Sequence, residues 1–304
     1  MKLEPNGVLV LDKDRGMTSH DCVFKLRKLF HTKKVGHTGT LDPEVTGVLP
    51  ICLGRATKLS RFLTDEGKRY VAEVTIGTAT MTEDAHGEVV EQKVIAENEL
   101  DEDQIDEVMS RLIGIIEQVP PYYSAVKVNG KKLYEYARKG QTVERPRRMV
   151  EIHRLERTSA LTFEDGVCRF RMEIDCGKGT YIRTLAVQIG EKLGYPAHMS
   201  ELRRTSSGSF EESGAVSLDA LQAFDTVEER MAHVVPLEDV IKRWPAITIP
   251  KNRERYIRNG GKLNGISLEF DLFTVYNEEG IPLALYRRQD GTTDATVEVM
   301  LAID

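Results

Sequence analysis

Two stretches of the chain alternate apolar and polar residues and therefore predict long β-strands. Residues 68–77 set apolar side chains on one face, and residues 167–176 do the same with mostly charged residues between them. Successive side chains of a strand point to opposite sides, so this period of two indicates half-buried strands. The apolar faces consist of Tyr70, Ala72, Val74 and Ile76 in the first stretch and Cys168, Phe170, Met172, Ile174 and Cys176 in the second.

Apolar residues at helical spacing predict helices between the strands. One such stripe follows Thr18-Ser-His-Asp21, a variant of the capping box with Asp in its fourth position. Another runs over residues 181–193 and ends at Gly194, a residue type that commonly stops helices. Strands and helices thus both occur along the chain, and we expect a fold of the α+β class. Further helices are predicted at 55–63, 100–113 and 131–139, and a short strand at 7–12.

The pattern changes after Pro245, where short predicted strands are joined by glycine turns. Residues 268–277 and 281–287 predict a hairpin, and residues 297–302 predict a further strand. We therefore expect a large domain at 1–244 and a small β-rich domain at 245–304.

Charge is unevenly distributed along the 304 residues, although the net charge is only −6. Segment 82–118 holds 12 acidic and 2 basic residues, whereas segment 121–154 holds 9 basic and 3 acidic residues. Pro120-Pro121 opens this basic stretch, and we expect about 120–150 to project from the core because it is long and polar. A local concentration of basic residues can attract a polyanion even when the net charge is negative. The alternative is that these residues simply form a solvated helix face.

The composition is that of an ordinary globular protein, with 40% hydrophobic and 30% charged residues. No apolar run approaches the roughly 20 residues that span a bilayer. The first residues lack the apolar core of a secretory signal, so we expect a cytoplasmic protein with no membrane partner. The four cysteines form no Cys-x-x-Cys pair, which predicts reduced thiols and no structural zinc.

The segment from Lys34 to Gly54 surrounds one carboxylate, Asp42, with turn-forming residues. Pro43 fixes the backbone after Asp42 and biases Asp42 itself toward an extended conformation. An isolated Asp-Pro is usually a turn initiator. The loop is more polar than a simple turn requires, which favours a functional loop that presents Asp42 as a nucleophile or base. Its neighbouring polar residues are His37, Thr38, Thr40 and Thr46.

Four blocks occur in a characteristic order: Gly36-His-Thr-Gly-Thr-Leu-Asp-Pro43, Lys68-Arg-Tyr70, Gly179-Thr-Tyr-Ile-Arg183 and Leu202-Arg-Arg204. In these blocks the chain resembles the bacterial TruB-type tRNA pseudouridine(55) synthases over about residues 5–210. That family converts uridine 55 in the T loop of tRNA to pseudouridine. The resemblance implies a pseudouridine synthase fold with a mixed, mainly antiparallel central sheet flanked by helices. It further implies an RNA-gripping thumb at about 120–150 and a C-terminal PUA-like RNA-binding domain.

The resemblance also implies catalytic roles. Asp42 matches the aspartate that initiates breakage of the N-glycosidic bond, and a carboxylate is ionised at neutral pH, as a nucleophile must be. Arg183 matches its charge partner, which would orient the anion and favour its charged form. Tyr70 matches the residue that stacks on the target base and is a candidate for proton transfer. The plainer interpretations are a surface arginine on a helix and a core tyrosine on a strand.

Substrate contacts follow from the same resemblance. Tyr181 and Leu202 match the walls of the uracil pocket, although core packing would also explain Leu202. His37 matches a residue that enters the space left by the flipped nucleotide, the alternative being a turn histidine. The basic segment would contact phosphates of the T arm. Its expected RNA-binding residues are Lys131, Lys132, Arg145, Arg147 and Arg148.

Two other functions compete with this interpretation. A tRNA-binding folding factor acting without catalysis would have no need for a carboxylate that faces the RNA. A nucleotidyl transferase would need a second histidine or a Gly-Lys-Ser/Thr loop, and neither follows His37. Isomerisation requires no cofactor and no metal, so we expect neither. The resemblance to the family further suggests that the protein is a monomer whose partner is tRNA. Whether Asp42 attacks C1′, attacks C6 or drives a glycal route stays open at the level of sequence.

Overall fold

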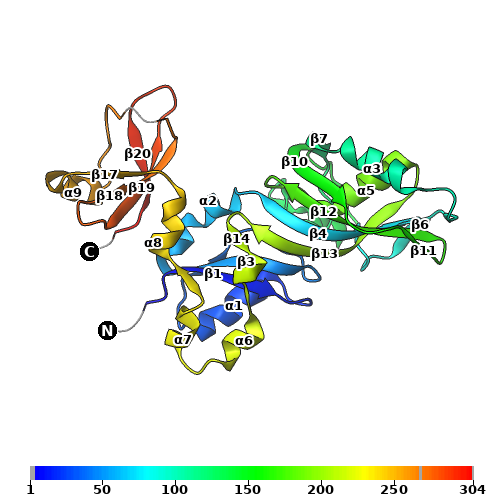
Figure 1. The fold of residues 1–304 in the computed structure, drawn as a ribbon, viewed down its shortest axis with the longest axis horizontal. Coiled ribbons are helices and arrows are strands. Elements are labelled where there is room, and N and C mark those ends of the chain that lie inside the picture. Colours follow the sequence, from blue (N-terminus) through cyan, green and yellow to red (C-terminus); the bar gives the residue numbers. More distant parts are fainter. Residues whose placement is uncertain (1–3, 267–268, 303–304) are drawn as a thin grey trace.

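The computed structural model describes residues 4–266 and 269–302, which form a long twisted sheet and a smaller sheet beside it (Figure 1). Within the described residues the larger sheet has 12 strands, with the main order β15-β1-β3-β13-β4-β12-β10-β7. The strands of this sheet are β1 (Gly7–Lys13), β2 (Val35–His37), β3 (Thr46–Leu53), β4 (Lys68–Ile76), β7 (Gly114–Gln118), β10 (Arg148–Arg157), β11 (Thr162–Glu164), β12 (Val167–Cys176), β13 (Ala197–Ser207), β14 (Phe210–Glu211), β15 (Val216–Ser217) and β16 (Val234–Pro236).

The large sheet is mixed and mainly antiparallel. Strand β13 runs parallel to β3 on one side and antiparallel to β4 on the other. Strands β1 and β15 form another parallel pair. The other pairings of the described strands in this sheet are antiparallel. This mixture brings the ends of β3, β4 and β13 together, and these ends carry the residues of the candidate site.

The two alternating patterns form the neighbouring central strands β4 and β12. Tyr70 pairs with Ile174, and Ala72 pairs with Met172, so the two apolar faces coincide and bury one another. All nine apolar positions predicted from the alternation are buried. Apolar burial of this kind is the main favourable contribution to folding.

The helices of the larger part cover the sheet and connect its strands. Their bounds are α1 (Ser19–Leu29), a 3-10 helix (Gly54–Leu59), α2 (Ser60–Thr64), α3 (Glu102–Ser110), α5 (Ile182–Leu193), α6 (Leu218–Ala223), α7 (Val227–Met231) and α8 (Leu237–Val240). The Thr18 hydroxyl accepts from the Asp21 N–H and the Asp21 carboxylate accepts from the Thr18 N–H, both at 3.0 Å, which confirms the predicted capping box. Gly194 ends α5 with φ 79°, in the left-handed region that glycine favours.

The thumb, residues 119–147, leaves the sheet after β7 and returns to it at β10. Gln118 and Arg148 are direct partners in that strand pair, so the thumb begins and ends at one place on the sheet. It contains β8 (Lys127–Val128), β9 (Lys131–Lys132) and α4 (Leu133–Ala137). The predicted helix at 131–139 is therefore shorter than expected, because Lys131 and Lys132 belong to a hairpin. Leu133 is fully buried at the start of α4, and its N–H donates to the Val126 carbonyl within the thumb at 2.8 Å.

The small C-terminal sheet has the order β17-β18-β19-β20 and is accompanied by α9 (Lys251–Arg258). Its strands are β17 (Ala246–Thr248), β18 (Leu272–Tyr276), β19 (Pro282–Arg288) and β20 (Ala295–Met300). The predicted hairpin is present, but its first strand begins at Leu272 rather than at residue 268, which lies outside the described residues. The last strand also ends earlier than predicted, since Leu301 turns away to pack.

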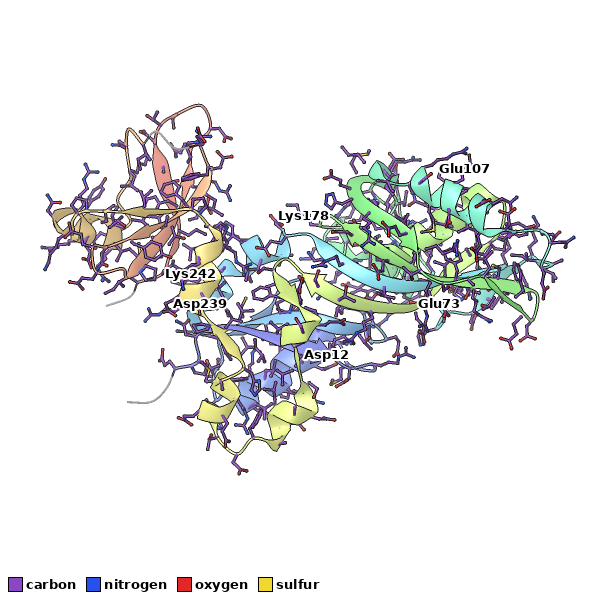
Figure 2. All side chains as sticks on the ribbon, in the orientation of Figure 1. Asp12, Glu73, Glu107, Lys178, Asp239 and Lys242 are labelled. Carbon is purple, nitrogen blue, oxygen red and sulfur yellow. The ribbon has the colours of Figure 1, made fainter. Side chains whose placement is uncertain are left out.

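The small sheet is joined to the large one through a shared apolar cluster. Leu285, Val299 and Leu301 pack into one cluster with Val8 and Val10 from β1. The Arg55 guanidinium donates to the Leu301 carbonyl at 3.2 Å across the same boundary. The connection runs through α8, beside which Asp239 and Lys242 form an ion pair at 2.6 Å (Figure 2).

Candidate active site

Asp42 lies on the loop between β2 and β3, and this loop is held from several sides. The Ser19 hydroxyl donates to the Leu41 carbonyl at 3.0 Å and accepts from the Leu41 N–H at 2.9 Å. The Gly16 N–H donates to the Pro43 carbonyl at 2.9 Å. Gly47 has φ 102°, and a Cβ there would lie 2.2 Å from the Arg204 carbonyl, so only glycine fits. The loop is a rigid mount for one carboxylate.

Lys13 supports the same loop from inside the protein. Its side chain is fully buried at the end of β1. Its ammonium donates to the carbonyls of Asp14, Met17 and Pro43 at 2.9, 2.7 and 3.0 Å. Burial lowers the pKa of Lys13, with nearby carboxylates opposing that shift. Sequence analysis missed this residue; a lysine ending an apolar strand is the signal that could have found it.

Arg183, in the first turn of α5, forms an ion pair with Asp42 whose Nη2–Oδ2 distance is 2.9 Å. The Arg183 side chain is only 7% exposed, whereas that of Asp42 is 45% exposed. The guanidinium also donates to the carbonyls of Thr82 at 3.0 Å and Tyr123 at 2.9 Å. The arginine is therefore fixed by buried contacts, and the carboxylate it orients remains accessible.

A second carboxylate approaches Arg183 from the loop after β5 (Thr78–Thr80), which pairs with β6 (Val89–Gln92). The Asp84 Oδ2 atom lies 3.7 Å from Arg183 Nη1. Asp84 itself accepts from the Thr82 hydroxyl at 2.6 Å and from the His86 N–H at 3.0 Å. Sequence analysis did not select Asp84, since nothing local distinguishes it within an acidic segment.

Two cavities meet at the Asp42–Arg183 pair, because both residues line each of them. The larger has a volume of about 510 Å³, and its walls include Tyr70, Tyr181 and Leu202. The structure thus brings together five of the six residues predicted to be catalytic or to bind the substrate base. The second cavity, of about 340 Å³, lies toward the thumb and is lined there by Tyr123, Tyr134 and Arg138.

The two tyrosines of the larger cavity stay in their phenol form at neutral pH. Burial raises the pKa of Tyr70, opposed by the charge of its cross-strand neighbour Arg204. Burial also raises the pKa of Tyr181. The Tyr181 N–H donates to the Gln118 side chain at 2.9 Å, which fixes the backbone just before α5. A phenol offers both a flat face and a proton.

Three further cations line the larger cavity and were not given roles by sequence analysis. The Arg204 guanidinium, 1% exposed, donates to the carbonyls of Val48 at 2.7 Å and Gly39 at 3.1 Å. The Lys68 ammonium donates to the carbonyls of Thr64 and Glu66 at 2.9 and 2.8 Å. Lys178, labelled in Figure 2, lies at the rim and pairs with Asp65 at 3.0 Å. The cavity is therefore rich in positive charge.

His37 is the predicted site residue that lies outside both cavities. It sits on β2, half-buried, and pairs with Ile51 of β3. Burial lowers the pKa of His37, and the charges of Arg204 and His20 add to this shift. The imidazole is therefore neutral at neutral pH, and its buried Nδ1 atom has no hydrogen-bond partner.

The five predicted RNA-binding residues differ in their surroundings. Lys131 is exposed beside the Tyr136 ring, and Lys132 is half-buried beside Tyr134. Arg147 is exposed and pairs with Glu117 at 2.6 Å. Arg148 is exposed at the wall of the larger cavity. Arg145 is more buried than its neighbours and contacts groups of the thumb base.

Neither a metal cluster nor a membrane span is found in the part of the chain that the structure describes. Over residues 4–266 and 269–302, no group of three or more His, Cys, Asp or Glu side chains is arranged to hold an ion. No helix in these ranges is long and apolar enough to cross a bilayer. All four cysteines are free and buried.

Comparison with solved structures defines the class of fold. A chain described as "Crystal Structure of a Cbf5-Nop10-Gar1 Complex" matches with a TM-score of 0.67 and 31% identity, over 94% of this chain and 79% of that one. A chain described as "Structure of H/ACA RNP bound to a substrate RNA containing 2'-deoxyuridine" gives 0.68 and 26%, over 98% and 86%. The fold is that of the pseudouridine synthases, which confirms the predicted class.

The family follows from sequence comparison. Residues 27–182 match the model of the TruB family pseudouridylate synthase N-terminal domain, and residues 183–242 match that of the tRNA pseudouridylate synthase B C-terminal domain. The tRNA pseudouridine synthase B of Shouchella clausii is 53% identical over 286 residues, which are 94% of each chain. That of Bacillus pumilus is 52% identical over 291 residues, which are 93% of each chain. The chain therefore belongs to the TruB family of tRNA pseudouridine synthases, which are isomerases, as predicted.

Proposed function

We propose that this protein isomerises uridine 55 in the T loop of tRNA to pseudouridine. The observation that carries the proposal is the ion pair of Asp42 with the buried Arg183 at the wall of the larger cavity. An accessible carboxylate whose orientation is fixed is what a nucleophile or base requires. The relatives named tRNA pseudouridine synthase B support tRNA as the substrate.

The reaction exchanges one bond of C1′ for another. Asp42 initiates cleavage of the bond between C1′ and N1, the detached uracil turns, and C1′ bonds to C5. The C5 proton leaves and N1 gains a proton, so the product is an isomer of the substrate. The pocket has to retain the free base between these steps, and Tyr70, Tyr181 and Leu202 supply the apolar and aromatic walls to do so.

Tyr70 stacks on the target base and is the group for proton transfer. Its raised pKa keeps the ring uncharged at neutral pH, which supports stacking on a neutral base. His37 enters the T loop where the nucleotide has left. A neutral imidazole there offsets part of the few kcal/mol that base flipping costs.

The thumb and the small C-terminal sheet hold the RNA outside the cavity. Lys131, Lys132, Arg147 and Arg148 contact phosphates of the T arm in a shape-directed manner. The small sheet, at residues 245–304, acts as a PUA-like RNA-binding domain. Its helix α9 supports this role by presenting Lys251, Arg253 and Arg255 at exposed or half-exposed positions.

The proposal is tested with a T-arm stem-loop carrying tritium at C5 of the target uracil. The wild-type protein should release tritium, and Asp42→Asn should abolish release while RNA binding is retained. Asp219→Asn, an exposed carboxylate in the first turn of α6, is the matched control and should keep full activity. No release from the wild type on a folded stem-loop, or full release by Asp42→Asn, would refute the proposal.

A further inference from the structure

Three consecutive residues, Thr82, Glu83 and Asp84, hold the first turn of α5 from two sides. The Thr82 carbonyl and the Asp84 carboxylate both face Arg183 Nη1, at 3.0 and 3.7 Å. Glu83 between them turns the other way, and its Oε2 atom accepts from the Thr184 hydroxyl at 3.0 Å. One short segment therefore contacts both Arg183 and Thr184.

Glu83 adopts a backbone conformation that residues other than glycine seldom take, with φ 61°. Such conformations persist where the surroundings hold them, and they concentrate at functional sites. Here the Glu83 N–H donates to the Thr80 carbonyl and the Met199 N–H donates to the Glu83 carbonyl, both at 3.2 Å. Burial raises the pKa of Glu83, while Thr184, Arg183 and Arg145 favour its charged form.

Arg145 reaches Glu83 from the thumb. Its Nη1 atom lies 3.9 Å from the Glu83 Oε1 atom and donates to the Pro120 carbonyl at 3.1 Å. Its guanidinium also stacks over the Tyr122 ring, 4.4 Å from the centroid. The Tyr122 hydroxyl in turn donates to the Val143 carbonyl at 3.2 Å. Arg145 thus ties the two ends of the thumb together at the point where they meet Glu83.

The thumb contacts the catalytic arginine directly as well. The Tyr123 carbonyl, one residue beyond the stacked Tyr122, accepts from Arg183 Nη2 at 2.9 Å, and the same nitrogen bonds Asp42. Two links therefore connect the thumb to the Arg183 region: Tyr123 to Arg183, and Arg145 to Glu83. A displaced thumb would break both links.

We propose that Glu83 and Arg145 form a latch, by which docking of the thumb orients Arg183 against Asp42. The inference rests on the proposed catalytic function of the Asp42–Arg183 pair. It makes Arg145 a positioning residue, in contrast to the phosphate contact that its position in a basic segment first indicated. Arg147, two residues on, has a side chain that is 71% exposed, against 28% for Arg145, and it retains the phosphate role.

A double-mutant cycle tests the latch. Glu83→Gln and Arg145→Gln should each slow single-turnover tritium release at saturating RNA by about tenfold, and the double variant should be no slower than the slower single one. RNA affinity and its salt dependence should change little in Arg145→Gln. Multiplicative losses in the double variant would refute the latch. So would a salt slope reduced by about 1 in Arg145→Gln, which indicates a lost phosphate contact.

Amide hydrogen exchange of the thumb gives a readout that does not depend on activity. Without RNA, Glu83→Gln should raise exchange in residues 119–147, and Arg145→Gln should raise it at least as much, because Arg145 also contacts Pro120 and Tyr122. Arg147→Gln is the matched control, since it removes the nearby pair with Glu117 and should leave thumb exchange unchanged. Unchanged exchange in Glu83→Gln would overturn the latch even if tritium release is slowed. Raised exchange in a protein that releases no tritium would instead contradict only the proposed function.

Discussion

Two sets of basic residues lie around the candidate site, and they differ in the groups that accept their hydrogen bonds. The buried set, Lys13, Lys68, Arg183 and Arg204, donates mainly to backbone carbonyls. The exposed set on the thumb and its base, including Lys131, Arg147 and Arg148, faces aromatic rings, a surface glutamate or solvent. The first set fixes backbone at the Asp42 loop and around the larger cavity, whereas the exposed set can exchange its partners for phosphates.

This difference has an electrostatic consequence. A carbonyl satisfies the hydrogen bonds of a cation without cancelling its charge, so the buried set leaves the larger cavity positive. Charges buried in this way are little screened by salt, whereas those of the thumb are strongly screened. We therefore expect buried cations to act on the geometry of the reacting groups and exposed ones to act on association with RNA. The four predictions below test this division, in order of expected effect.

Arg183→Gln should have the largest effect. Loss of one preorganised charged donor beside the reacting group lowers the single-turnover rate about 10²–10³-fold. RNA affinity should change little, because Arg183 is buried and faces Asp42 rather than the surface. Rates come from tritium release and affinities from filter binding. Arg154→Gln, a surface pair with Glu156 on β10, serves as the control. A loss confined to affinity would place Arg183 with the exposed set.

Lys13→Met should destabilise the protein rather than weaken RNA binding. Three carbonyls lose their buried donor, so the free energy of unfolding should fall by roughly 3 kcal/mol. Urea denaturation measures the change. Lys242→Met, in an exposed pair with Asp239, should change the free energy of unfolding far less. Equal losses in the two variants would show that burial does not distinguish these lysines.

Replacing Arg147 and Arg148 together by alanine should reduce the slope of log affinity against log salt by about 2, because two phosphate contacts are lost. The unfolding free energy should stay within about 0.5 kcal/mol of the wild type, since both side chains are exposed. Affinity is measured at several salt concentrations on the T-arm stem-loop. An unchanged slope would remove both arginines from the RNA contacts.

His37 reports its own burial and, to a smaller extent, the charge of Arg204, and its replacement should have the smallest effect. Its pKa is lowered in the folded protein, so its contribution to stability is present above its unfolded pKa of about 6.5 and is lost as pH falls through the folded pKa. Below pH 6.5 the unfolding free energy should decline by at most about 1.4 kcal/mol per pH unit from this group. His37→Gln should flatten the decline. An identical pH profile in the variant would contradict the lowered pKa.

Local patterns predicted much of the fold correctly. The alternation in β4 and β12, the capping box at Thr18 and the stop at Gly194 depend on backbone geometry and near neighbours, which the sequence contains directly. Element ends were less accurate. Residues 131–132 form a hairpin strand instead of a helix, because they pair with Lys127 and Val128, and pairing of this kind outweighs local helix preference.

The sequence by itself determined the family, the sheet core and the loop that carries Asp42, because each depends on residue types at short spacing. Only the tertiary structure decided that Lys13 supports that loop, that Glu83 and Arg145 face each other, and that the small sheet shares its core with β1. These contacts join residues far apart in the chain, and no periodicity records which strand ends will meet. Burial also distinguishes chemically identical residues: the half-buried Arg145 contacts Glu83, whereas the exposed Arg147 pairs with Glu117 at the surface.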